Sequence, residues 1–295
     1  MRRHPVILAL CLLFFIGMVF FAVIYGLSVL QGEGGSFSLR GKVGVVRIEG
    51  MIGDTAEIID QISEFADDDG ILAVVLRIDS PGGGVASSQE IYQAVRQLRN
   101  NKKVVVSMGS IAASGGYLIA TAADRIMANP GTITGSISAV MHFANVEELL
   151  KKVGVRASVV KSGKFKDIGS PTREMTPEER ELVQVIVNDI YDQFVTTVSE
   201  NRKIPLEKVV KLADGRIFSG RQALDLDLVD ELGGLQDAVL LAGRLAGIKG
   251  KPAIAYAVKK RTSLWKYLVE NMASILSEKI GLRTAETPGI HYLFE

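Results

Sequence analysis

The chain is poor in the residues that build disulfides and zinc sites. It has 295 residues but a single cysteine, at position 11, and three widely separated histidines, His4, His142 and His291. One cysteine cannot form an intrachain disulfide, and scattered histidines do not make a zinc-ligand pattern. We therefore expect neither a disulfide framework nor a metal site.

The chain also lacks an excess of charge of either sign. Its 34 lysines and arginines balance 33 aspartates and glutamates, so the formal net charge is +1. Proteins that bind nucleic acid usually carry a clear positive excess, and we expect no nucleic-acid partner here. The hydrophobic fraction of 47% is enough for a sizeable core, although one N-terminal region raises it.

That region is a long run without any charged side chain, residues 5–30. About 20 apolar residues span a bilayer as a helix, whereas the apolar core of a secretory signal has only about 7–15. The length favours a retained transmembrane anchor over a cleaved signal peptide. Arg2 and Arg3 precede the run, and Arg40 and Lys42 follow only at a distance. The positive-inside rule then predicts a single-pass protein of the cell (inner) membrane, with a cytoplasmic N-terminus and an extracytoplasmic body.

Four parts follow from the composition along the chain. Residues 1–30 contain the N-terminal end and the anchor, 31–36 form a Gly-rich linker, 37–258 form the body, and 259–295 form a basic amphipathic tail. The tail could lie on a membrane surface, pack on a neighbouring subunit or dock on its own domain.

The sequence pattern of the body predicts an α/β fold, because strand-like runs alternate with helix-like runs. The strand-like runs are 43–48, 72–78, 104–108 and 125–128. Apolar residues at helical spacing predict helices over 56–65 and after residue 84. Strands separated by helices imply crossover connections and a mainly parallel sheet. Farther along, Thr-Pro-Glu-Glu at 176–179 is a capping box that predicts the start of a long helix.

Ser114 is the candidate nucleophile. A turn is predicted over 109–114, after the strand-like run 104–108, and Gly115 begins a predicted helix over 115–123. A serine at a strand-to-helix turn is exposed on a rigid support. The helix N-terminus also offers free N–H groups to an oxyanion, that of Gly115 first. The same small residues would also suit a tight helix–sheet contact, so the assignment of Ser114 as the nucleophile needs support from other motifs.

A second oxyanion donor is expected from the Ser-Pro-Gly-Gly-Gly loop at 80–84. The loop follows the strand 72–78, and in a parallel sheet it lies at the same carboxyl edge as Ser114. Glycine lets a backbone N–H approach a ligand closely, and Gly83 is the expected donor. A phosphate-binding loop is the alternative, but this segment lacks the lysine and the Ser/Thr of a P-loop.

The general base could be a histidine or a lysine. His142 is the one histidine in the middle of the body, and its apolar neighbours resemble an ordinary half-buried position. A lysine can act as a base if it is neutral, and burial can lower the ordinary lysine pKa of about 10.4 by several units.

Lys166 is the candidate lysine, within Ser-Gly-Lys-Phe-Lys-Asp at 162–167. Such a lysine needs a hydrogen-bond partner to hold it, and Ser136 in the Thr-Gly-Ser motif at 134–136 could accept this bond. The neighbouring Lys161 and Lys164 are expected to be solvated surface charges, as most lysines are.

Four motifs carry a resemblance to a known family. They lie at 80–84, 113–117, 134–136 and 162–168. Their order and spacing resemble the short, single-domain bacterial form of the signal peptide peptidase A family, over roughly residues 40–250. The resemblance implies a Clp/crotonase-like spiral of β-β-α units, preceded by one transmembrane helix, and a Ser–Lys dyad.

The resemblance also implies roles for single residues. Ser114 would be the nucleophile and Lys166 the general base, Ser136 would help to hold Lys166, and Gly83 and Gly115 would form the oxyanion hole. No cofactor is required. Family members degrade remnant signal peptides after their release from secreted precursors. They assemble as homo-oligomeric rings or domes, often octameric in the short form, in which a neighbouring subunit can contribute to the active site.

The sequence therefore predicts a membrane-anchored serine endopeptidase that degrades remnant signal peptides and other apolar peptides. Three alternatives stay open. One is a related membrane Ser–Lys protease with another membrane substrate. Another is a crotonase-like acyl-CoA enzyme or acyl-binding module, which also uses backbone N–H donors but has no need of Ser114 with Lys166. The third is an inactive scaffold.

Overall fold

The computed structural model describes residues 14–22, 41–257 and 291–293, which fall in two units, Met1–Arg40 and Gly41–Glu295. In the first unit, residues 14–22 form a helix. Among the described residues, no helix combines the length and the apolar character needed to cross a bilayer. Most of the expected anchor within 5–30, the linker 31–36 and nearly all of the tail 259–295 lie outside the described residues, so these expectations stay predictions.

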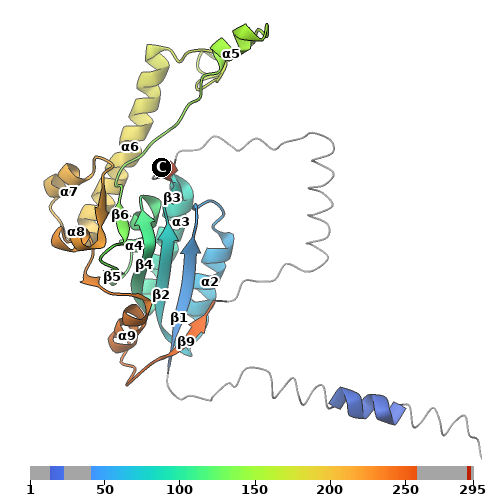
Figure 1. The fold of residues 1–295 in the computed structure, drawn as a ribbon, viewed down its shortest axis with the longest axis vertical. Coiled ribbons are helices and arrows are strands. Elements are labelled where there is room, and N and C mark those ends of the chain that lie inside the picture. The colour runs from blue at the N-terminus through green and yellow to red at the C-terminus, as the bar shows by residue number, and fades with distance from the viewer. Residues whose placement is uncertain (1–13, 23–40, 258–290, 294–295) are drawn as a thin grey trace, which may run out of the picture. The chain divides into compact units, whose positions relative to one another are not determined.

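The second unit is an α/β domain built on one mainly parallel sheet (Figure 1). Within the described residues the sheet has eight strands, in the order β7-β6-β4-β2-β1-β9, with β5 beside β4 and β8 beside β5. The described pairs within this sheet are parallel except β6 with β7. The strands are β1 Lys42–Glu49, β2 Ile71–Ser80, β4 Lys103–Ala113, β5 Arg125–Ala128, β6 Ile133–Gly135, β7 Ile217–Ser219, β8 Glu231–Leu232 and β9 Ala253–Tyr256.

Helices cover both faces of the sheet. The helices are α2 Ala56–Asp67, α3 Val85–Asn101, α4 Gly115–Ala120, α5 Glu147–Lys152, α6 Pro177–Arg202, α7 Leu206–Leu212, α8 Gly220–Asp225 and α9 Leu235–Leu245. In β2, Val74 and Leu76 pack on the side of α2, α3 and α4, whereas Ala73 and Val75 pack on the side of α9. This is why the strand is apolar at nearly every position, and the expected α/β fold with a mainly parallel sheet is confirmed.

Two predicted turns are wrong, and both lie near the candidate nucleophile. The strand β4 does not end at residue 108 but continues to Ala113, because its second half finds a new partner: residues 105–107 pair with β5 and residues 111–113 pair with β6. The predicted Ser-Pro-Gly-Gly-Gly loop at 80–84 is also partly strand. β2 runs to Ser80, and the short strand β3, Gly82–Gly84, forms beside Ile52.

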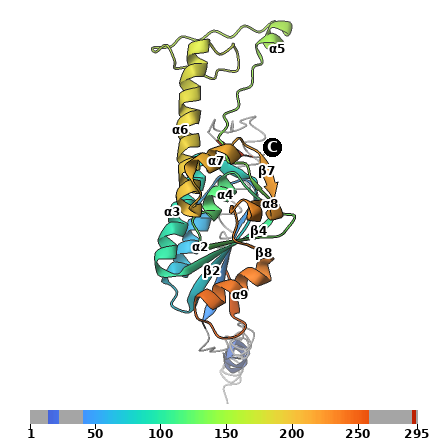
Figure 2. The ribbon, with the colours of Figure 1, turned by 90° about the vertical axis from the view of Figure 1, so that its left-hand side faces the viewer.

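Residues 138–189 extend away from the rest of the domain (Figures 1 and 2), and we call them the arm. The arm contains α5 and the N-terminal half of α6, and Glu179 is its one buried residue. Only the C-terminal half of α6 packs in the core, through Ile190, Phe194 and Val198. The predicted capping box is confirmed, with Thr176 and Glu179 bonding each other's backbone N–H.

The two leucines of β2 provide a test of how this strand packs in the core. Leu76 is 0% exposed and Leu72 is 40% exposed. Leu76→Ala should lower the free energy of unfolding by about 2–5 kcal/mol, because it opens a cavity in the core. Leu72→Ala should cost less than about 1.5 kcal/mol. Urea denaturation of the full chain, followed by circular dichroism, measures both, and equal losses would contradict the burial of Leu76 in the core.

Candidate active site

Ser114 lies where β4 ends and α4 begins, in an unusual backbone conformation. Its φ is 53° and its ψ is −118°, a region that L-residues with side chains rarely adopt. Such a conformation costs about 1–3 kcal/mol and persists only where its surroundings enforce it. Two backbone hydrogen bonds hold Ser114 in this conformation. Its N–H donates to the Gly135 carbonyl at 2.8 Å, and its carbonyl accepts from the Leu118 N–H at 2.9 Å. Backbone strain of this kind clusters at functional sites.

The side chain of Ser114 is buried and unpartnered. Ser114 is 1% exposed, and its Oγ has no hydrogen-bond partner among the described residues. The expectation of an exposed nucleophile is therefore wrong for the single chain. The reason is that β4 stays paired with β6 up to Ala113 and every residue of α4 beyond is buried. A buried hydroxyl normally has a partner, so the exception makes Ser114 a candidate for a functional role.

Ser136 lies beside Ser114. Ala113 and Gly135 are partners in the parallel β4–β6 pair, so the two serines that follow them leave the sheet as neighbours. Ser136 also has a positive φ, 51°, and is 5% exposed. Its N–H donates to the Arg216 carbonyl at 2.9 Å, which holds it in this conformation.

Gly83 occupies the middle of β3, a strand that contacts α4. On one side of β3, Ile52 accepts from the Gly84 N–H at 2.9 Å and donates to the Gly82 carbonyl at 2.8 Å. Because successive residues of a strand point their polar groups to opposite sides, the Gly83 N–H faces away from Ile52. A Cβ at Gly83 would lie 2.1 Å from the Ile52 carbonyl oxygen, so only glycine fits. The site thus gathers Gly83, Gly115, Ser114 and Ser136 at one end of the sheet.

The free side of β3 carries a second strand. Residues His291–Leu293 form β10 and pair antiparallel with Gly82–Gly84, with Tyr292 opposite Gly83. The edge of β3 can therefore take up an extended backbone, as in recognition by β-strand addition. A three-residue strand leaves no periodicity, and the sequence did not predict it.

Lys166 is not part of this group. It lies in the arm with an exposed side chain, in a turn closed by its own N–H and the Gly163 carbonyl at 3.1 Å. In both views the arm points away from α4, where Ser114 lies (Figures 1 and 2). Within the described residues, the Lys166 ammonium has no hydrogen bond or ion pair. The alternative base, His142, is exposed in the same arm.

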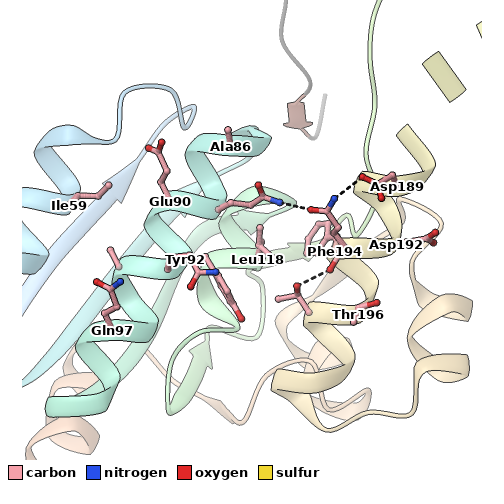
Figure 3. A pocket seen from close by; sticks show the side chains of 15 residues that line it. Ile59, Ala86, Glu90, Tyr92, Gln97, Leu118, Asp189, Asp192, Phe194 and Thr196 are labelled. Carbon is pink, nitrogen blue, oxygen red and sulfur yellow. Dashed lines mark hydrogen bonds between the residues drawn. The ribbon is translucent and has the colours of Figure 1, made fainter. Parts of the chain in front are cut away.

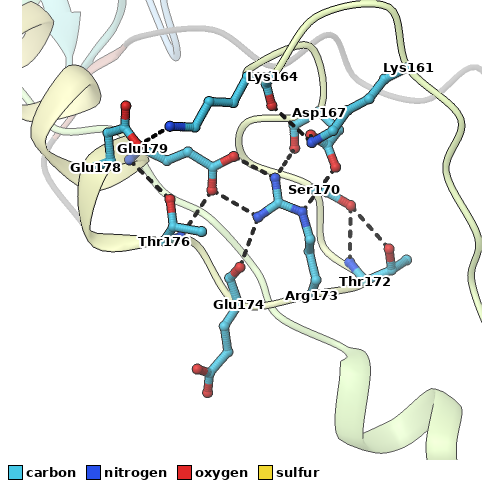
Figure 4. Close-up of polar contacts among 10 residues, drawn as sticks. All are labelled: Lys161, Lys164, Asp167, Ser170, Thr172, Arg173, Glu174, Thr176, Glu178 and Glu179. Atoms are coloured by element: carbon cyan, nitrogen blue, oxygen red, sulfur yellow. Dashed lines mark hydrogen bonds and ion pairs between the residues drawn. The ribbon is translucent and has the colours of Figure 1, made fainter.

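The other two lysines of this loop are paired with carboxylates. Lys161 Nζ contacts Asp167, and Lys164 Nζ contacts Glu178 in the first turn of α6 (Figure 4). Both lysines are exposed, as expected of surface charges, and each is in addition paired, because acidic side chains from the loop and from α6 lie within reach. Lys166 is thus the one lysine of the loop whose ammonium is not engaged within the part of the chain that the structure describes.

Sequence reasoning missed Arg173. Its guanidinium lies between the carboxylates of Asp167 and Glu179 (Figure 4). Arg173, through hydrogen bonds and charge, holds the pKa of Asp167 far below its usual range and lowers that of Glu179 to about 2. The available signal was an arginine six residues from an acid on either side, which is too common to single out.

A large hollow lies elsewhere on the domain. It is a groove of about 1020 Å³ between α3 and α6 (Figure 3). Tyr92, Leu118 and Phe194 contribute to its apolar part, and Gln89 and Gln193 bond across it at 3.0 Å. None of the four site residues, Gly83, Ser114, Gly115 and Ser136, lines it, so size alone does not identify the site.

Comparison with known proteins assigns the family. The profile of peptidase family S49 matches residues 96–249, and that of the Clp protease family matches residues 43–133. A Synechocystis protein provisionally named as a protease is 47% identical over 212 residues, which cover 72% of this chain and 76% of that protein.

Two further relatives carry more specific names. An Enterococcus faecium protein, provisionally named signal peptide peptidase SppA, is 34% identical over 67% of this chain and 62% of its own. Protease 4 of Salmonella typhi is 40% identical over 67% of this chain and 32% of its own. The resemblance drawn from the motifs is confirmed, and with it a serine protease built on a Clp-like domain. The chain belongs to peptidase family S49, and it is of the SppA and Protease 4 type.

Proposed function

We propose that this protease is a membrane-anchored endopeptidase in which Ser114 is the nucleophile and Lys166 the general base, and that it degrades remnant signal peptides and other apolar peptides. The observation that carries the proposal is the buried Ser114 Oγ, which lacks a partner at a strained helix start. A nucleophilic serine needs a base within hydrogen-bond reach, and an unoccupied hydroxyl is ready to receive one.

The chemistry is an acyl transfer in two halves. Neutral Lys166 takes the proton of the Ser114 Oγ as the oxygen attacks the peptide carbonyl carbon. The N–H groups of Gly115 and Gly83 stabilise the oxyanion that forms. Lys166 then gives the proton to the leaving amine, and the C–N bond breaks. Water, deprotonated by the same lysine, hydrolyses the acyl-enzyme and regenerates the serine. Ser136, next to Ser114, would hold the lysine in place.

We propose that the dyad forms between subunits, with Lys166 of one copy meeting Ser114 of the next. The two residues lie apart in the single chain, and the arm that carries Lys166 exposes many large apolar side chains. They are Phe143, Leu149, Val153, Val155, Val159, Val160, Leu182, Val185 and Ile186. Exposed apolar surface of this extent usually marks an interface. A head-to-tail contact repeated around an axis closes a ring, consistent with the expected octamer.

The substrate would bind along β3 as an added strand. β10 pairs antiparallel with Gly82–Gly84, and a peptide in its place would pass Gly83 with its scissile carbonyl near the oxyanion donors. The uncharged run 5–30 would keep the catalytic body next to the bilayer, on its extracytoplasmic side, where apolar peptides accumulate. An acyl-CoA module is less favoured, because it would not require a strained, unpartnered serine.

Removal of either dyad member should abolish catalysis. Ser114→Ala and Lys166→Ala should each lower peptide turnover by at least about 10³-fold, because nucleophile and base act as a unit. A fluorophosphonate probe should label Ser114 in the wild type and not in Lys166→Ala. Lys164→Ala is the matched control and should stay within a few-fold of wild type. Normal labelling of Ser114 in Lys166→Ala would eliminate the dyad.

Mixed assemblies test whether the dyad is shared. Co-expressed Ser114→Ala and Lys166→Ala chains should recover roughly a quarter of wild-type turnover, because in a head-to-tail ring one junction in four pairs an intact serine with an intact lysine. Mixing either single variant with the Ser114→Ala/Lys166→Ala double variant measures the background turnover of assemblies that contain no intact pair. If the dyad forms within one chain, the mixed assembly stays inactive.

Gly83→Ala tests the second oxyanion donor. The new Cβ would meet the Ile52 carbonyl and displace β3. We expect turnover to fall by about 10²–10³-fold, the effect of losing one oxyanion-hole donor. Gly53→Ala is the control, since a Cβ there has nothing within 4 Å. Equal activity of the two variants would remove Gly83 from the site.

A further inference from the structure

All five N–H donors of the Arg173 guanidinium are hydrogen-bonded. A guanidinium has five N–H donors in a rigid planar fork. Here Nε donates to Asp167 Oδ2 at 2.9 Å, and Nη2 donates to the Asp167 carbonyl at 3.2 Å. Nη1 and Nη2 donate to the Glu179 carboxylate at 2.8 and 2.5 Å, and Nη1 also donates to the Glu174 carbonyl at 2.9 Å. Every donor has an acceptor, so the orientation of the group is determined (Figure 4).

One end of this cluster holds the residue next to Lys166. Asp167 follows Lys166 directly, and Arg173 binds it through both its carboxylate and its carbonyl oxygen. On the other side, the Lys166 N–H is bonded to the Gly163 carbonyl. The backbone of Lys166 is therefore restrained from both directions, while its side chain stays free.

The other end of the cluster holds the helix that anchors the arm. Glu179 is the arm's one buried residue, with a side chain 4% exposed. It accepts the Thr176 N–H at 2.9 Å, and Thr176 Oγ1 accepts the Glu179 N–H at 3.2 Å. From this turn α6 runs without a break to Phe194 and Val198 in the core.

From these contacts we propose that Arg173 is a positioning residue for Lys166: it fixes the lysine-bearing loop to the first turn of α6 and so sets where the Lys166 ammonium reaches. The inference rests on the proposed Ser–Lys dyad. A base displaced by about 1 Å can lose about 10²-fold in rate, so an arm with a single buried residue needs such a restraint.

No other contact in the described part of the loop could replace it. The Lys164–Glu178 pair also joins the loop to α6, but its side chains are 66% and 55% exposed, and exposed pairs contribute little. Lys161 contacts Asp167 within the loop and does not reach α6. A lysine at position 173 would offer a point charge and could not serve two carboxylates and two carbonyls together.

The test measures the rate and the final extent of fluorophosphonate labelling at Ser114 in the full chain. Arg173→Met and Arg173→Lys should both label about 10²-fold more slowly than wild type, yet reach the same final label per chain. Peptide turnover should show the loss in kcat, with KM changed less than about threefold. Ethylguanidinium added to Arg173→Ala should restore part of the rate. Arg180→Met, which removes a neighbouring arginine without a side-chain hydrogen bond among the described contacts, should label like wild type.

Other outcomes overturn the inference. A normal labelling rate in Arg173→Met would show that Lys166 needs no such restraint. A normal rate with a reduced final extent would assign Arg173 to folding or assembly alone. If Arg173→Met does not fold, Asp167→Asn keeps the size of the loop and should slow labelling about tenfold. An unchanged rate in that variant would also overturn the inference. Failure of the dyad itself is seen separately, as normal labelling in Lys166→Ala.

Discussion

The pairing of β4 with two successive partners is the constraint on which the site depends. Its first half pairs with β5 and its second half with β6, so the strand continues well past the point where its apolar run ends. The pairing with β6 delivers Ser114 and Ser136 to adjacent positions, and both residues have a positive φ. The backbone strain, the burial of the hydroxyl and the start of α4 all follow from this register, so strand pairing in the sheet positions the candidate nucleophile.

The candidate base belongs to a different part of the molecule. Ser114 is held by strand pairing in the core, whereas Lys166 lies next to an arginine–carboxylate cluster on an arm whose one buried residue is Glu179. A lysine base needs a desolvated environment, and the single chain offers Lys166 none. Assembly would supply this environment, the missing partner of the serine and the cover for the apolar arm together. On the proposed scheme, cleavage would be confined to the assembled form.

Family membership and the structure support different parts of this account. The S49 match over 96–249 includes both Ser114 and Lys166, whereas the Clp match over 43–133 includes the serine but not the lysine. The division is consistent with a nucleophile placed by the shared fold and a base placed by the arm. The catalytic roles, the membrane anchor and the ring are proposals, and the experiments above test the catalytic roles and the sharing of the dyad between subunits.

Local pattern determined much of this protein. The doubly buried strands, the amphipathic helices and the Thr176–Glu179 capping box were predictable, because alternation and capping are properties of short segments. The segments that surround Ser114 were also predictable, because runs of small residues and glycines indicate a close approach of the backbone. Only the tertiary structure decided that β4 continues to Ala113, that the Ser114 hydroxyl is buried without a partner, that β10 lies on β3 and that Arg173 joins two carboxylates. Each of these features depends on partners remote in sequence or on the full geometry of a side chain. A local sequence pattern contains information on neither.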